Sequence, residues 1–439
     1  MSRKASLISS LLLGTVLALH DSPAFSERIL TLEEAYRLAD RQNEQVQTAR
    51  EDLLQAESET RRARSFILPK VSADYNYLRR PDPLFSPFGV LRPESEDEFS
   101  VLLEQPLYSG GRAMATYRIA KKGREGQKLN LNLTRETLLF NVARAYYEAL
   151  KAQKNVAIEE SEVKRLEEHR NNADKRVRVG EATRTVLLRA EAELSGAKAR
   201  LIRAQNNLAT GKDQLALLVR IEGPYDLAEP SSGAFSEKTD EEWIRTANEN
   251  RFDLQSRAIE TEIAREQVKF ARGAFLPSLS LEARYDWVDQ DPKSSFLIQN
   301  DRTAMLKLNI PIFEGGRRVA ELSQAKSRFR QSEMTRNFLK DQVDLEVRRA
   351  LLNLSALTSE LNQLKDQVAF ARDNFSLVSR QFAVGLSTHI DVLDANATLL
   401  DAERQFSNTT YDRAVASLDL ERTAGVFLEL IRPNEGREP

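Results

Sequence analysis

The sequence QPLYSGGR at residues 105–112 recurs as IPIFEGGR at residues 310–317, and this repetition organises the whole chain. Other stretches repeat in the same order: RSFILPKVSADYNY from residue 64 returns in RGAFLPSLSLEARYDW from residue 272, and TLEEAYRLADRQNE from residue 31 returns as TDEEWIRTANENRF from residue 239. The offset between the copies stays near 205 to 208 residues. Matches that keep both their order and their spacing indicate an internal duplication.

Proline positions separate helical from non-helical parts in each copy. Outside the two ends of the chain, the prolines fall within residues 69–106, 224–230 and 277–311, and proline is not tolerated inside a helix. The proline-free stretches 112–179 and 317–384 therefore predict helices of about 100 Å. The stretches 31–66 and 181–219 are a little over half that length, so two shorter helices laid end to end would match one long helix. A soluble antiparallel coiled coil explains these helices equally well.

The proline-rich pieces alternate apolar and polar residues, as β-strands with two different faces do. This pattern predicts a β-hairpin at residues 70–106 and another at 278–311. Strands of about ten residues with this alternation are typical of outer-membrane barrels, of which the smallest has about eight strands. Four strands cannot close such a barrel, so several chains would have to share one. The alternative is a small sheet that caps a helical rod in water.

The N-terminus has the pattern of an export signal. A basic start at Arg3 and Lys4 precedes an apolar run at residues 7–19 and a small-residue region before Glu27. The apolar run is too short to span a bilayer, which needs about 20 residues. The chain has no cysteine, which excludes disulfides and thiolate metal sites. Its net charge of -2 argues against a nucleic-acid partner.

Two related stretches follow the long predicted helices: VGEATRTVLLRAE at residues 179–191 and VGLSTHIDVLDAN at residues 384–396. A helix of such length must reverse, and glycine supplies the backbone freedom for the turn. Gly180 and Gly385 are therefore predicted to be turns at the tips of two helical hairpins. Asp391 and Asp394 follow the second turn, three residues apart and hence on one helix face. The alternative is that both aspartates are ordinary solvated residues.

This combination resembles the TolC family of outer-membrane factors, over nearly the whole chain. The resemblance rests on the duplication, the Leu-Pro before each first strand, the two Gly-Gly-Arg turns and the two Val-Gly turns. It implies a mainly α fold with β, in which a long α-helical barrel joins a 12-stranded transmembrane β-barrel that a homotrimer shares, four strands per chain. The expected division is a signal peptide at 1–26, a first structural repeat at 27–222, a linker at 223–238, a second repeat at 239–432 and a tail at 433–439.

The resemblance also implies functional residues. Asp391 and Asp394 would form a ring around the periplasmic entrance of the channel and attract cations. Crowding would raise the pKa of some of these carboxyl groups. A Tyr and an Arg that help to close the entrance in well-known members are replaced by Phe382 and Ser387. We consider that Arg189 could pair with Asp394 instead. The strand-to-helix turns would be Gly110, Gly111, Gly315 and Gly316, and a periplasmic adaptor would dock on the tips at Val179, Gly180, Thr183, Val384, Gly385 and Thr388.

The sequence offers little for catalysis. Its three histidines, His20, His169 and His389, are not spaced to share a metal on one helix face, and no nucleotide-binding or hydrolase motif is present. We interpret His389 as a solvated turn residue, and Glu159 and Glu160 as ordinary helix-surface charges. We therefore expect neither an enzyme nor a cofactor nor a metal site.

The expected function is that of a trimeric outer-membrane channel-tunnel in a tripartite export system. It would contact outer-membrane lipid, a periplasmic adaptor and an inner-membrane RND or ABC transporter, and it would conduct drugs and toxic compounds passively to the outside. One alternative is the outer-membrane component of type I protein secretion. Another is a periplasmic coiled-coil scaffold without channel activity, and a stand-alone porin fits poorly because it does not need such long helices.

Overall fold

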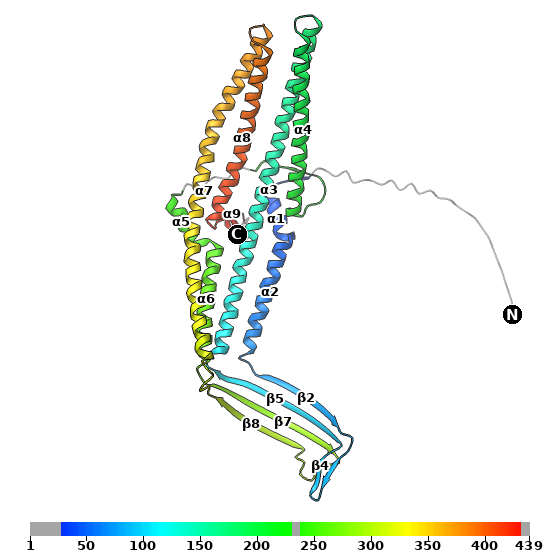
Figure 1. The fold of residues 1–439 in the computed structure, drawn as a ribbon, viewed down its shortest axis with the longest axis vertical. Helices are drawn as coiled ribbons and strands as arrows, with labels where there is room; N and C mark the ends of the chain where they lie inside the picture. The colour runs from blue at the N-terminus through cyan, green and yellow to red at the C-terminus, as the bar shows by residue number, and fades with distance from the viewer. Residues whose placement is uncertain (1–27, 231–237, 432–439) are drawn as a thin grey trace, which may run out of the picture.

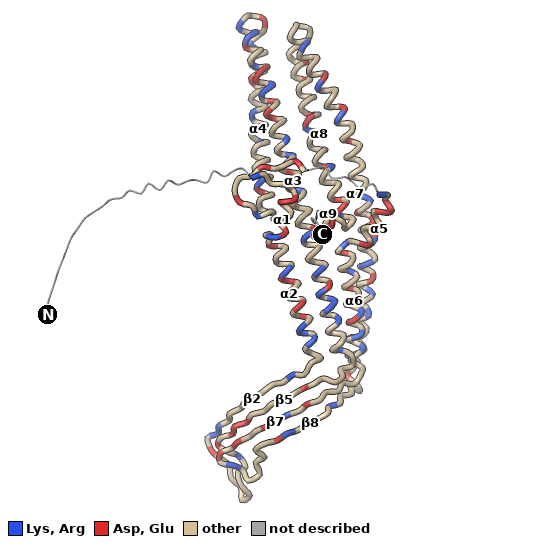
Figure 2. Tube along the Cα trace, turned by 180° about the vertical axis from the view of Figure 1, so that it is seen from behind, with Lys and Arg blue, Asp and Glu red and all other residues tan. Residues whose placement is uncertain are grey.

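The computed structural model describes residues 28–230 and 238–431, which form a long helical rod with a curved β-sheet at one end (Figure 1). The predicted signal peptide, the C-terminal tail and residues 231–237 of the linker lie outside the described residues. Acidic and basic residues are interspersed along the helices (Figure 2). None of the described helices combines the length and the apolar character needed to cross a membrane.

Two helices of equal length run along the rod. They are α3 (Arg112–Arg178) and α7 (Arg317–Ala383), with 67 residues each. On the half near the sheet, α2 (Glu44–Ser65) packs on α3 and α6 (Phe252–Gly273) packs on α3 and α7. On the far half, α4 (Arg184–Val219) returns along α3 and α8 (His389–Thr423) returns along α7 (Figure 1). The predicted pairing of two shorter helices with one long helix is therefore present in both copies.

The shorter helices meet end to end at joints that satisfy their exposed backbone groups. Asn43 separates α1 (Leu32–Gln42) from α2, and its side chain accepts a hydrogen bond from the Gln45 amide. The same side chain donates to the carbonyl of Leu218 near the end of α4, at 3.1 Å. At the second joint, Arg251 separates α5 (Asp240–Asn250) from α6 and pairs with Asp253. These contacts give polar partners to the chain where α1 passes into α2 and where α5 passes into α6, as a buried helix end requires, and the first of them also ties this joint to α4.

The four long strands form one antiparallel sheet in the order β2-β5-β7-β8, namely β2 (Lys70–Arg79), β5 (Ser95–Ser109), β7 (Ser278–Asp291) and β8 (Asn300–Asn309). Both predicted hairpins are present. Their registers correspond, because Val71 lies opposite Leu103 in the first hairpin and Leu279 lies opposite Leu308 in the second. A small hairpin that the sequence pattern did not predict, β3 (Leu84–Ser86) with β4 (Gly89–Arg92), occupies the first loop.

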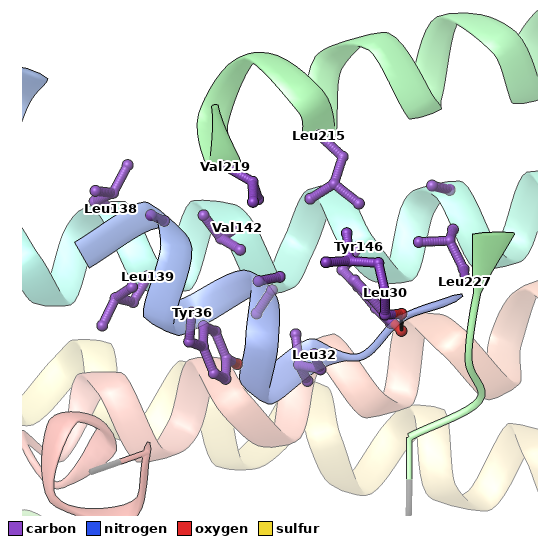
Figure 3. Packing of buried hydrophobic residues seen from close by; sticks show 14 of the residues in the cluster. Leu30, Leu32, Tyr36, Leu138, Leu139, Val142, Tyr146, Leu215, Val219 and Leu227 are labelled. Atoms are coloured by element: carbon purple, nitrogen blue, oxygen red, sulfur yellow. Dashed lines mark hydrogen bonds between the residues drawn. The ribbon is translucent and has the colours of Figure 1, made fainter. Parts of the chain in front are cut away.

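The largest apolar cluster surrounds the middle of the rod (Figure 3). There β1 (Arg28–Leu30) pairs in parallel with β6 (Tyr225–Leu227), and α9 (Phe427–Ile431) closes the end of α8. Tyr146 of α3 is fully buried, and its hydroxyl lies 2.8 Å from the Leu30 carbonyl and 2.7 Å from that of Ala228. This hydroxyl therefore ties both short strands to the long helix.

We expect Tyr146→Phe to lower the free energy of unfolding by about 1–2 kcal/mol, because a buried carbonyl loses its donor. The effect stays moderate because the Leu30 carbonyl also accepts a hydrogen bond from the Ala228 amide. Chemical denaturation followed by circular dichroism measures the change. Tyr117→Phe, on the same helix, is the matched control. Equal stability of the two variants would show that the hydroxyl is not a structural tie.

Candidate channel entrance and docking tips

Each long helix ends in a turn that requires glycine. Gly180 and Gly385 have φ values of 80° and 79°, which are rare for residues with a side chain, and no atom lies within 4 Å of the place that a Cβ would take at either position. The preceding residues, Val179 and Val384, are 70% and 71% exposed. The two tips thus present apolar side chains at the end of the rod that is far from the sheet (Figure 1).

The two tips differ in how the returning helix begins. Thr388 forms a capping box with Asp391: its hydroxyl accepts from the Asp391 amide at 3.3 Å, and the Asp391 carboxylate accepts from the Thr388 amide at 2.7 Å. Thr183 occupies the same place before α4 but makes no such side-chain bond. Hydrogen bonds from Thr388 lower the pKa of Asp391. Within one chain, Asp391 is therefore an ionised residue that also caps the helix.

The other predicted entrance residues lie close by, but not all of the expected contacts between them are formed. Asp394 is exposed and lines a cavity of about 420 Å³ together with Arg189. Among the described residues, no ion pair connects these two side chains. The Ser387 hydroxyl donates to the carbonyl of Val378 at 3.1 Å, which holds the turn against α7.

Two histidines meet beside Phe382, a contact that the sequence pattern did not predict. His169 of α3 and His389 of α8 approach to 2.5 Å between Nε2 and Nδ1, and the Phe382 ring lies 5.8 Å from the His169 ring. His389 is only 8% exposed, so its interpretation as a solvated turn residue was wrong. Burial and the neighbouring His389 lower the pKa of His169 to about 4. Burial and the Arg189 guanidinium also lower the pKa of His389, against a smaller effect of Glu193.

A buried ionic network lies further along the same helices. The Glu162 carboxylate accepts two hydrogen bonds from Asn396 of α8, at 2.7 and 3.0 Å, and pairs with Arg165 at 3.1 Å. Glu159 pairs with Arg404 of α8 and with Arg200 of α4. Glu159 is buried, so its interpretation as a surface charge was wrong. Its position one helical turn from Glu162 was the available signal, since both carboxylates share one face.

At the opposite end, the chain passes from sheet to helix through the predicted Gly-Gly turns. Gly110 has a φ of 65° and lies against Gly273, so that a Cβ on Gly110 would stand 2.3 Å from the Gly273 carbonyl oxygen. Gly111 also has a positive φ but has no atom within 4 Å of such a Cβ, and the same is true of Gly315 and Gly316. Gly110 is therefore required by close main-chain packing as well as by its conformation.

A helical rod that reverses at two tips and ends in a short antiparallel sheet is the architecture of outer-membrane channel proteins. The chain belongs to the outer membrane efflux protein family, whose sequence pattern matches residues 35–219 and 243–426. It is accordingly an outer-membrane protein whose helical part extends into the periplasm. The resemblance seen in the sequence is thereby confirmed.

Individual relatives support the same assignment. The chain is 26% identical to the outer membrane protein TolC of Vibrio cholerae over 84% of both chains. It is 25% identical to the alkaline protease secretion protein AprF of Pseudomonas aeruginosa over 96% of this chain and 90% of that one. Among solved structures, CusC superposes with a TM-score of 0.81 at 18% identity, covering 93% and 95% of the two chains. The Campylobacter jejuni CmeC outer membrane channel superposes with a TM-score of 0.79 at 19% identity, covering 90% and 86%. These two structures establish the fold.

Proposed function

We propose that three copies of the chain form one passive export duct, with a shared 12-stranded barrel in the outer membrane and a helical tunnel below it. The observation that carries this proposal is the four-stranded sheet with two outer strands, β2 and β8. An unpaired strand edge in lipid leaves backbone groups without partners, at several kcal/mol each. Because neighbouring strands alternate in direction, β8 of one chain can pair antiparallel with β2 of the next and so close a ring.

One face of the sheet is suited to lipid and the other to water. Val71, Tyr75, Leu306 and Leu308 are exposed apolar residues on the outer strands. Between them in sequence lie polar residues, among which Lys307 pairs with Glu282 across the second hairpin. We infer that the apolar set contacts outer-membrane lipid in the assembled barrel, while the polar set lines the channel.

The internal duplication gives the register of the proposed subunit contact. Val101 of β5 lies opposite Tyr285 of β7 at the junction between the two hairpins. The corresponding residues in the other copies are Leu306 of β8, at an offset of 205, and Tyr77 of β2, at an offset of 208. We therefore expect Leu306 to lie opposite Tyr77 of the next subunit.

Cysteine cross-linking tests this contact, because the chain has no cysteine of its own. The double variant Leu306→Cys/Tyr77→Cys should form covalent dimers and trimers under mild oxidation. Leu306→Cys/Val71→Cys, six residues out of register, is the matched control and should remain monomeric on a denaturing gel. Equal cross-linking of both variants, or cross-linking of neither, would contradict the proposed ring.

We further propose that the tips receive a periplasmic adaptor and that an inner-membrane transporter supplies the energy. The exposed apolar residues Val179 and Val384 at both tips support this assignment, and the sequence lacks a nucleotide-binding motif. We assign small-molecule efflux as the main role and no catalysis. Type I protein secretion is the second candidate, because AprF is named as a protease secretion protein and is matched over most of its length.

Removal of the entrance carboxylates should change ion selectivity. We expect Asp391→Asn/Asp394→Asn to lower the K⁺ over Cl⁻ permeability ratio roughly tenfold, because three subunits together lose six negative charges around one constriction. Asparagine preserves an acceptor for the Thr388 amide, so the helix cap is retained. Reversal potentials in planar bilayers measure the ratio. The control Glu51→Gln/Asp52→Asn removes the same charge from α2, and an equal fall there would contradict an entrance ring at the tip.

A further inference from the structure

The two helical hairpins touch near the tips through three aromatic side chains: His169 on α3, Phe382 on α7 and His389 on α8. The His169 and His389 rings are nearly parallel, 8° apart, with centroids separated by 4.4 Å. Phe382 lies beside both, at 5.8 and 6.3 Å between ring centroids. We call this set the tip latch, because His169 belongs to the first hairpin and the other two residues belong to the second.

The two histidines are in contact through one nitrogen of each ring. Rings stacked face to face cannot bring their atoms much closer than about 3.5 Å, whereas Nε2 of His169 and Nδ1 of His389 are 2.5 Å apart. Because the planes are nearly parallel, this N···N distance limits the perpendicular offset between the two rings to at most 2.5 Å, so they are not in full face-to-face contact. The contact is therefore an N–H···N hydrogen bond, in which one neutral ring donates and the other accepts.

The surroundings shield this bond and disfavour added positive charge. His389 is buried, and its Nε2 atom has no hydrogen-bond partner among the described residues. The guanidinium of Arg176 lies over the Phe382 ring at 4.9 Å. Beside the latch is a cavity of about 600 Å³, to which α7 contributes Phe375, Ser379, Phe382 and Ala383. The charged groups that face the latch are Arg165, Glu168, Lys175 and Arg176 of α3, Glu181 of the first tip, and Arg189 and Glu193 of α4.

We propose that the tip latch holds the α7–α8 hairpin against α3 in the closed entrance, and that protonation of both histidines releases it. The proposal rests on the proposed channel function. It assigns the closing contact to His169 and His389, since Phe382 and Ser387 stand here in place of the Tyr and the Arg expected from the resemblance. A singly protonated pair keeps its hydrogen bond, because the charged ring donates to the neutral one. A doubly protonated pair has only N–H donors, so the bond is lost and two positive charges repel each other.

The pH dependence of opening follows from the histidine pKa values in the open and closed states. In the open state both rings are solvated and have an ordinary pKa of about 6.5, whereas burial lowers the pKa of both in the closed state. The open state therefore binds more protons, and acid favours it. The latch is at full strength above about pH 6.5 and is lost as the pH falls toward the His169 pKa of about 4.

Spin labels on Asn171→Cys of α3 and Ile390→Cys of α8 test the release directly, in trimers diluted with unlabelled subunits. We expect the interlabel distance to lengthen between pH 7.5 and pH 4.5. Channel open probability in planar bilayers should rise at least roughly tenfold over the same range. The double variant His169→Gln/His389→Gln can still form a hydrogen bond but does not titrate, so it should stay closed throughout. The double variant His169→Arg/His389→Arg carries both positive charges permanently and has no acceptor, so it should be open at pH 7.5.

Each result discriminates. A distance that does not change in the parent chain, or that lengthens equally in the Gln/Gln variant, would overturn the latch. Equal lengthening in the Gln/Gln variant would assign the acid response to carboxylates such as Asp394. Lengthening that is confined to the parent chain but is accompanied by no conductance at any pH would support the latch and contradict the channel. Circular dichroism and size-exclusion chromatography of each variant establish that it remains folded and oligomeric.

Discussion

Gly110→Ala is expected to destabilise the junction of sheet and rod by about 3 kcal/mol or more. Two costs add at this position. The positive φ of 65° disfavours any residue with a side chain, and the new Cβ would stand 2.3 Å from the Gly273 carbonyl oxygen. Neither main chain can withdraw easily, because β7 and α3 both begin within a few residues of the contact. The fraction of protein recovered as membrane-inserted oligomer measures the effect.

Gly111→Ala provides the control for this prediction. Gly111 has a φ of 78° but no atom within 4 Å of an added Cβ, so only the conformational cost of about 1–2 kcal/mol applies. We expect most of the oligomer to survive in this variant. Equal loss in both variants would show that the backbone conformation, and not the contact between Gly110 and Gly273, limits assembly.

Glu162→Ala should lower the free energy of local opening of α8 by about 2–3 kcal/mol. The Glu162 side chain is only 3% exposed, and its removal leaves the buried Asn396 amide without its acceptor and takes from Arg165 the nearer of its two carboxylates, the other being Glu403 at 3.7 Å. Breaking a buried ion pair typically costs about 3–5 kcal/mol. We expect the lower end because Arg165 retains some access to water, with 24% of its side chain exposed. Amide hydrogen exchange in the neighbouring part of α8 should accelerate by roughly one hundredfold.

Two further variants separate the causes of this effect. Glu162→Gln keeps an acceptor for Asn396 but removes the charge, so it should give an intermediate acceleration. Glu59→Ala removes the partner of Arg62 in an exposed pair on α2, where ion pairs contribute less than about 1 kcal/mol. If Glu59→Ala altered exchange as much as Glu162→Ala, burial of the network would not be the source of its strength.

Much of the fold follows from the sequence because its elements have local signatures. The proline clusters and the lengths between them predicted α3 and α7, and period-two alternation predicted the hairpins that contain Val71 and Leu279. The small β3–β4 hairpin was not predicted, because its strands have three and four residues and are too short to show a period. The tip glycines were identifiable because reversal of a long helix requires their conformation.

The site was less predictable because its contacts join the two copies. His169 and His389 are 220 positions apart, so they are not equivalent positions of the two repeats. Comparison of the repeats therefore gives no reason to place them together. Glu159 and Glu162 look like surface charges until α8 is known to cover their face of α3. Asp391 carries both a predicted entrance role and an unforeseen capping role, since its partner Thr388 was considered only as part of a docking tip.

Planar-bilayer conductance of the purified chain tests the channel most directly. We predict small, stepwise, cation-selective openings at neutral pH that trivalent cations block from the periplasmic side, where the carboxylates of Asp391 and Asp394 would bind them. A folded oligomer that inserts into the bilayer and shows no conductance, at neutral or acid pH, would contradict the channel and favour a periplasmic scaffold.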